Sequence, residues 1–139
     1  MRFSARLPSL LAAVLITGCG GDDDQKGPNG PVKTVPAGQP LRVVAKEYSF
    51  TPARVSTGGS EPIRFELDNR GSLAHNLKVL RGDRELGGTP TSPEGRRNGS
   101  VKLAPGKYRF VCTVGNHEQL GMVGELEVAE GSRQRRPER

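Results

Sequence analysis

The sequence predicts an all-β domain, a β-sandwich of about seven short strands between two polar ends. Turns are favoured over long helices because the 139 residues include 19 glycines and 11 prolines, with 4% aromatic residues and no tryptophan. Short apolar segments also alternate with turn signals at a regular spacing. The seven predicted strands span residues 41–50, 54–57, 63–67, 73–80, 100–103, 107–113 and 123–129.

A chain of this length suffices for one domain, which we place at residues 41–130. Residues 104–107, Ala-Pro-Gly-Lys, predict a tight turn that joins two strands as a hairpin, because proline fixes φ and glycine accepts a positive φ. Residues 81–98 are rich in Gly, Pro, Arg and Thr, which predicts a long surface loop.

The first 18 residues have the pattern of an export signal, with two arginines before an apolar stretch that is too short to span a bilayer. The stretch ends in Ile16-Thr17-Gly18-Cys19, which resembles the lipobox of bacterial lipoproteins, where the cysteine is acylated and becomes the new N-terminus. The alternative is an ordinary signal peptide that leaves Cys19 as a free thiol. We expect lipidation of Cys19 and a mature protein tethered to the periplasmic or extracellular face of a membrane.

The two ends of the domain are predicted to be disordered. Residues 19–40 contain few apolar side chains and predict a flexible linker, and residues 131–139 form a basic tail, either solvated or in contact with acidic lipid or an acidic partner. The net charge of +6 lies mostly in the ends, since residues 41–130 carry 13 basic and 11 acidic side chains. Without interleaved stacking aromatics, this distribution argues against nucleic-acid binding.

Strand periodicity predicts which side chains point into the core, because successive side chains alternate between two faces. In the fourth predicted strand, His75 shares a face with Leu73 and Leu77. In the sixth, Cys112 shares a face with Phe110. A histidine and a cysteine on the core faces of different strands are the arrangement that a buried metal site requires.

The segment that follows the sixth strand reads Cys112-x4-His117-x4-Met122. Beyond the first 19 residues, His75 and these three residues are the only histidines, cysteine and methionine of the chain. A thiolate with two imidazoles forms a trigonal ligand set, and a thioether adds a weak axial ligand, a combination that suits both oxidation states of copper. Taken singly, each residue is more often an ordinary core residue, but jointly they predict a copper site.

These residues resemble the landmarks of the cupredoxins, the plastocyanin-like family of type 1 (blue) copper proteins, over about residues 41–130. In chain order, the landmarks are Tyr48, Phe50 and Pro52, then His75 and Asn76, then Tyr108, Phe110 and Cys112, then His117 and Met122. The resemblance implies a Greek-key sandwich with one copper ion near one end, bound by Nδ1 of both histidines, by the cysteine sulfur and axially by Met122. It also implies that Asn76 braces the cysteine loop by hydrogen bonding.

The chain departs from many relatives in the loop before the second histidine, where Gly115 and Asn116 stand in place of a proline, and Glu118 follows the histidine. With Asn116 or another non-ligand where a second cysteine would stand, the site is expected to hold one ion. The resemblance also implies docking of a redox partner protein near His117, Leu120 and Val114.

The expected function is that of an exported, membrane-tethered one-electron carrier that acts as a monomer and is not an enzyme. The alternative is an envelope protein that binds and delivers copper without a redox role, although the chain has no Met-rich or His-rich tract. A nucleophilic Cys-His dyad is disfavoured, because no oxyanion hole or helix N-terminus is evident beside Cys112.

Overall fold

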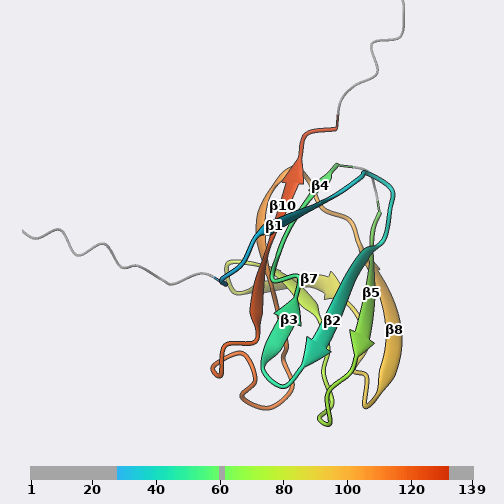
Figure 1. Cartoon of the computed structure of the whole chain (residues 1–139). Coiled ribbons are helices and arrows are strands. Elements are labelled where there is room, and N and C mark those ends of the chain that lie inside the picture. The colour runs from blue at the N-terminus through green and yellow to red at the C-terminus, as the bar shows by residue number, and fades with distance from the viewer. Residues whose placement is uncertain (1–27, 60–61, 132–139) are drawn as a thin grey trace, which may run out of the picture.

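The computed structural model describes residues 28–59 and 62–131, which form a curled β-sheet of ten strands (Figure 1). The strands are β1 (Val32–Val35), β2 (Leu41–Lys46), β3 (Ser49–Thr51), β4 (Arg54–Gly58), β5 (Ile63–Asn69), β6 (Lys78–Arg81), β7 (Arg84–Gly88), β8 (Gly95–Val101), β9 (Gly106–Val111) and β10 (Val123–Ala129). Within these ranges, no helix has the length and apolar character needed to cross a membrane. The predicted export signal, Cys19 and the tail beyond residue 131 lie outside the described residues.

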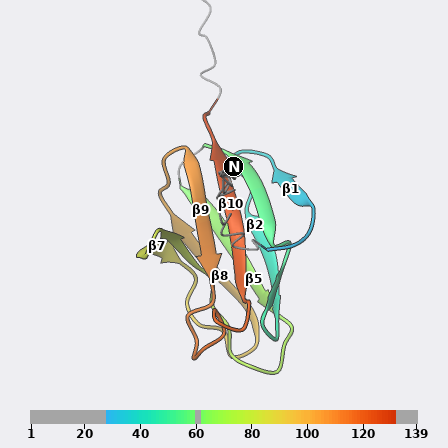
Figure 2. The same cartoon turned by 90° about the vertical axis from the view of Figure 1, so that its left-hand side faces the viewer.

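The sheet folds over into two layers (Figures 1 and 2). One layer holds β3, β2, β5 and β8, and the other holds β1, β4, β10, β9 and β6, with β9 and β10 side by side in Figure 2. Strand β7 lies between them in the sheet order: it pairs with β6 over several residues and with β8 at a single position, Gly88 opposite Ser100. The chain passes between layers after β1, β3, β4, β5 and β8, the connectivity expected of a Greek-key sandwich. The predicted all-β sandwich is confirmed, with ten described strands in place of seven.

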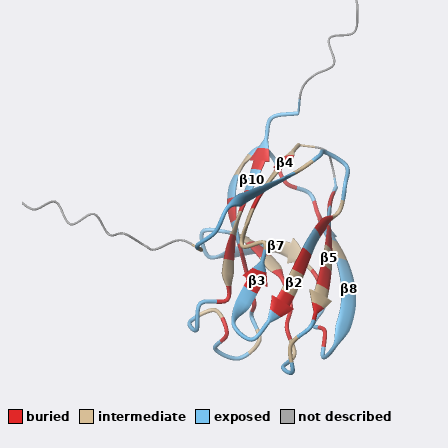
Figure 3. Ribbon diagram, in the orientation of Figure 1, coloured by how far each residue is buried: buried red, intermediate tan, exposed pale blue. Residues whose placement is uncertain are grey.

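The core lies between the layers and is built mainly from alternate residues of β2, β4, β5, β9 and β10 (Figure 3). In β5, for example, Ile63, Phe65 and Leu67 are buried while Arg64 faces solvent. This alternation of buried and exposed residues is what a strand with one solvent-exposed face requires. The predicted inward face that Phe110 shares with Cys112 is also observed, since both residues are buried, and Leu126 and Val128 of β10 are buried as well.

Strand β1 forms inside the segment that the composition predicts to be a flexible linker. Its four residues pair in parallel with β4, from Val32 opposite Arg54 to Val35 opposite Thr57. Three of the four residues are exposed and Val35 alone packs against the core, so the strand is held mainly by backbone pairing at the edge of the sheet. It lacks the apolar alternation that would reveal a strand in the sequence. Regular structure therefore begins before residue 40.

The long surface loop predicted at residues 81–98 is also corrected, since it contains β7 and the first part of β8. Two glycines of these strands, Gly88 and Gly99, allow neighbouring backbone segments to approach closely. A side-chain carbon at Gly88 would overlap the Leu77 carbonyl oxygen, and one at Gly99 would overlap the Gly88 carbonyl oxygen. Glycine marks this kind of close backbone contact as well as turns, and the sequence alone does not separate the two uses.

The turn at residues 104–107 does not form the predicted hairpin. Strands β8 and β9, which flank it, are not neighbours: β8 pairs with β5 and β7, whereas β9 pairs with β10 and β6. The Pro-Gly segment therefore carries the chain from one layer to the other. Local turn chemistry predicted the change of direction but not the partner strand.

Candidate metal centre

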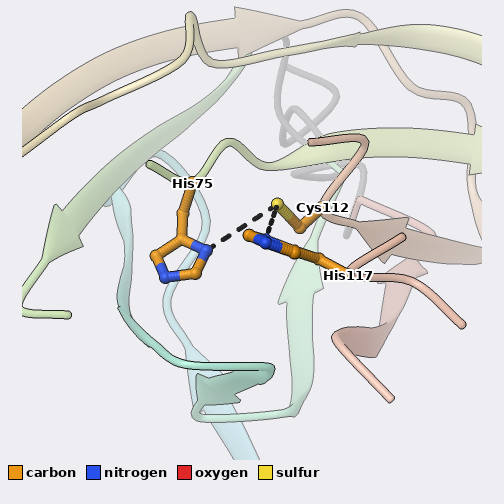
Figure 4. A group of neighbouring side chains, drawn as sticks. All are labelled: His75, Cys112 and His117. Atoms are coloured by element: carbon orange, nitrogen blue, oxygen red, sulfur yellow. Dashed lines mark hydrogen bonds between the residues drawn. The ribbon is translucent and has the colours of Figure 1, made fainter. Parts of the chain in front are cut away.

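Three of the four predicted ligands converge at one end of the sandwich (Figure 4). One nitrogen from each of His75 and His117 and the sulfur of Cys112 all lie within 4.8 Å of one another, and all three residues are buried. The Cys112 Sγ atom is 3.5 Å from Nδ1 of His117 and 3.9 Å from Nδ1 of His75. Both imidazoles thus present the same type of nitrogen to the sulfur.

His75 reaches the site from the segment between β5 and β6. The predicted strand over residues 73–80 is wrong in its first half, because β6 begins only at Lys78 and Leu73 is 40% exposed. His75 instead makes an isolated antiparallel bridge with Ser92: its N–H donates to the Ser92 carbonyl at 3.0 Å, and the Ser92 N–H donates back at 2.7 Å. This bridge fixes the backbone of His75, and its side chain is fully buried as the strand parity predicts.

Cys112 directly follows β9 and opens a loop that returns to β10. The loop is closed by its own backbone: the Cys112 N–H donates to the Met122 carbonyl at 3.2 Å, and the Met122 N–H donates to the His117 carbonyl at 3.0 Å. The His117 N–H in turn donates to the Val114 carbonyl at 3.1 Å. An ion pair of 3.3 Å between Arg109 and Glu118 ties the loop to β9. These contacts hold three predicted ligands in one closed turn.

Met122 is fully buried at the end of this loop. Its backbone bonds to Cys112 and His117 place it next to the cluster, and its side chain belongs to the hydrophobic core. Its role as an axial ligand stays a prediction. A thioether in that position is a weak, soft donor, in contrast to the three strong donors of the cluster.

Asn76 links the His75 segment to the cysteine loop. Its Oδ1 atom accepts the N–H of Thr113 at 2.8 Å, and its Nδ2 group donates to Thr113 Oγ1 at 2.9 Å and to Thr91 Oγ1 at 3.3 Å. Because Thr113 follows Cys112, these bonds restrain the two chain segments that carry His75 and the sulfur. Such outer contacts orient ligands and fix their spacing.

The surroundings of His75 favour a neutral imidazole. Burial lowers the pKa of His75 below its usual value, and the neighbouring His117 lowers it further, while Glu47 opposes both effects. A neutral ring keeps a nitrogen lone pair available at neutral pH, which is the form that binds metals.

Apolar side chains are exposed beside the cluster. His117 is 8% exposed, the Tyr48 ring meets it edge-on with centroids 5.2 Å apart, and Tyr48 and Leu120 are 39% and 48% exposed. Tyr48 carries a positive φ of 56° in the turn between β2 and β3, which is uncommon for a non-glycine residue. The sequence marks Tyr48 as a landmark of the resemblance, but the contact of its ring with His117 comes from the tertiary fold.

No family model matches the chain, and no curated protein matches its sequence. Solved structures are similar. Auracyanin from Roseiflexus castenholzii is 18% identical, with 65% of this chain and 96% of that chain covered and a TM-score of 0.58. Auracyanin A, a "blue" copper protein from Chloroflexus aurantiacus, is 16% identical, with coverages of 69% and 99% and a TM-score of 0.54. A purple cupredoxin from Nitrosopumilus maritimus is 18% identical, with coverages of 64% and 99% and a TM-score of 0.51. At these identities the similarity establishes a shared fold.

Proposed function

We propose that this chain, which has the cupredoxin fold, binds one type 1 copper ion through His75, Cys112 and His117, with Met122 as a weak axial ligand, and carries single electrons. The observation that supports this most is the convergence of one buried sulfur and two Nδ1 atoms. A metal with bonds of about 2.3 Å to sulfur and 2.0 Å to nitrogen at trigonal angles separates those atoms by roughly 3.7 Å. The separations of 3.5 and 3.9 Å fit such an ion.

The donor set favours copper over zinc. Structural zinc sites take four strong ligands in a tetrahedron, whereas a thiolate and two imidazoles with a weak thioether match the blue-copper pattern. Bound copper supplies reversible one-electron chemistry between Cu(I) and Cu(II). The chain's own residues hold the donors in place through the Asn76 bonds and the closed loop, and their burial excludes water. A buried, restrained ligand set favours electron transfer over copper delivery, which needs a ligand that opens to the acceptor.

The test of copper binding is a titration of the metal-free domain with Cu(II). We expect one equivalent to bind and to give an intense visible absorption together with the paramagnetic resonance spectrum of a single type 1 site. A weak absorption with the spectrum of an ordinary tetragonal Cu(II) site would contradict the proposal.

Electrons are proposed to pass through the edge of His117, with partner proteins docking over Leu120, Tyr48 and Val114. His117 is the least buried of the three clustered ligands, the exposed Tyr48 ring contacts its imidazole, and the exposed Leu120 lies three residues further along the same loop. Glu118, next to His117, adds a charge that steers a partner.

Leu120→Asp is expected to slow electron self-exchange between reduced and oxidised copies by about tenfold, because a desolvated carboxylate opposes apolar contact at the docking patch. Line broadening in the NMR spectra of mixed redox states measures this rate without an identified partner. The matched control is Val32→Asp, since Val32 on β1 is equally exposed at 49% against 48% for Leu120. Equal rates in the two variants would remove the patch from the proposed path.

We also propose that the protein is exported and lipid-anchored through Cys19, on the basis of the signal and lipobox patterns. In a bacterial host, the full chain is expected in the membrane fraction, with an N-terminal peptide whose mass includes acyl groups on Cys19. Cys19→Ala should abolish that modification. A soluble mature chain with an unmodified Cys19 would contradict the anchor and leave the copper site unaffected.

A further inference from the structure

The far nitrogen of His75 is a buried polar atom without a hydrogen-bond partner among the described residues. His75 is fully buried, and its Nδ1 atom faces the Cys112 sulfur, so Nε2 points away from the cluster (Figure 4). When Nδ1 binds a metal, Nε2 carries the ring proton and becomes a donor. A buried N–H without an acceptor is destabilising, and metal-bound histidines almost always donate this proton to an outer acceptor.

A carboxylate approaches from the turn between β2 and β3. Glu47 accepts hydrogen bonds from the N–H of Ser72 and from its hydroxyl, the latter at 2.9 Å, so this exposed side chain is held over the segment that leads to His75. The Ser72 backbone bond is the largest of the effects that lower the pKa of Glu47 to about 2. Glu47 is therefore ionised throughout the neutral range, although it faces solvent.

Gly71 lies between the Glu47 carboxylate and Nε2 of His75 and places no side chain in the space between them. A methyl group built on Gly71 would lie 2.7 Å from Oε1 of Glu47 and 3.1 Å from Nε2 of His75. One small group would therefore touch both atoms, which shows that the carboxylate and the ring nitrogen face the same point. The turn thus places Tyr48 against His117 and its neighbour Glu47 towards His75.

From this geometry we propose that Glu47 is the outer acceptor for the Nε2–H of His75, directly or through one water molecule, and that its charge lowers the reduction potential of the copper site. The inference rests on the proposed function. Glu47 is a positioning residue, which makes His75 a stronger donor and adds negative charge near the metal; both effects favour Cu(II) over Cu(I).

The competing role is purely structural, in which Glu47 only fastens the loop through Ser72. Measurements of stability and copper binding do not separate the two roles. The reduction potential and the hydrogen bonding of Nε2 in His75 do. Glu47→Gln keeps the size of the side chain and removes its charge. Ser72→Ala removes one donor to the carboxylate and leaves that charge in place.

The experiment measures the reduction potential of the copper-loaded protein by voltammetry. Glu47→Gln is expected to weaken the preference for Cu(II) by about fivefold. Because a tenfold change corresponds to about 59 mV for a one-electron couple, the reduction potential should rise by about 40 mV. Glu47→Asp keeps the charge and should recover at least half of the shift, and Ser72→Ala should stay close to wild type. The shift should shrink with added salt, because Glu47 is exposed.

The matched control is Glu127→Gln. Glu127 is an exposed carboxylate on β10, five residues beyond Met122 and so roughly 16 Å along the strand, and its removal should leave the potential almost unchanged. As a second readout, the ¹⁵N resonance of Nε2 in His75 of the diamagnetic Cu(I) protein should move in Glu47→Gln and not in Glu127→Gln.

The outcomes separate the two proposals. Equal potentials and equal Nε2 resonances in Glu47→Gln and Glu127→Gln, in a protein with the expected blue absorption, would overturn the role of Glu47 and leave the copper site intact. A wild-type chain without that absorption would overturn the proposed function itself and the inference with it.

Discussion

Replacement of Cys112 by serine is expected to remove nearly all of the intense visible absorption of the copper-loaded domain. This absorption arises from charge transfer between a thiolate and copper, and Cys112 is the single sulfur of the cluster, 3.5 and 3.9 Å from the two imidazole nitrogens. Serine is close in size, so the core and the Asn76 contacts to Thr113 should persist. A hydroxyl is not deprotonated at neutral pH as a bound thiol is, and we expect Cu(II) affinity to fall by at least about tenfold.

The control for Cys112→Ser is Met122→Gln, a change in the same loop to the proposed axial ligand. This variant should retain copper and a strong absorption, with a lower reduction potential, because an amide oxygen is a stronger donor that favours Cu(II). Absorption and paramagnetic resonance spectra of the two variants, measured with one equivalent of copper, make the comparison. An unaltered spectrum in Cys112→Ser would be fatal to the assignment of the ligands.

The core of this site could be predicted because its chemistry is concentrated in few residues. The chain has two histidines and, beyond Cys19, one cysteine, and the loop spacing keeps Cys112 and His117 close whatever the fold. Strand alternation then predicted inward side chains for His75 and Cys112, and both are fully buried. The parity held for His75 even though a single bridge to Ser92 replaces the predicted strand there.

The strands and contacts that the sequence did not predict depend on interactions that leave little pattern in it. Strands β1 and β8 are largely exposed and β7 is at most half-buried, so all three are held mainly by backbone bonds, which are open to almost any residue. Glu47 meets Ser72 across 25 residues of chain, a contact that no motif marks. The resemblance implied that Asn76 braces the cysteine loop, but not that its partner is Thr113, 37 residues away. Such pairs are set by how the two layers pack, so the sequence predicted the ligands better than the residues that position them.

Gly124→Ala is expected to destabilise the metal-free domain by about 3 kcal/mol, the upper end of the usual cost of overfilling a packed core. Gly124 is buried on β10 directly opposite Phe110 of β9, and a side-chain carbon there would overlap the Phe110 ring. The ring has little room to withdraw, because it is 1% exposed and packs against Phe50 with centroids 5.3 Å apart. Denaturant unfolding of the metal-free protein measures the change.

A double-mutant cycle with Phe110→Leu tests whether the overlap with the ring is the cause. The leucine variant alone should lose stability through reduced core packing, whereas in the Gly124→Ala background the smaller side chain should recover at least about 1 kcal/mol of the loss. Phe110 lies two residues before Cys112 on the same face of the chain, so Gly124→Ala should also shift the copper absorption, and the double variant should bring it back towards wild type. Two outcomes would show that a side-chain carbon at position 124 does not clash with the Phe110 ring: additive effects of the two substitutions on stability, or a Gly124→Ala free energy of unfolding within about 0.5 kcal/mol of wild type.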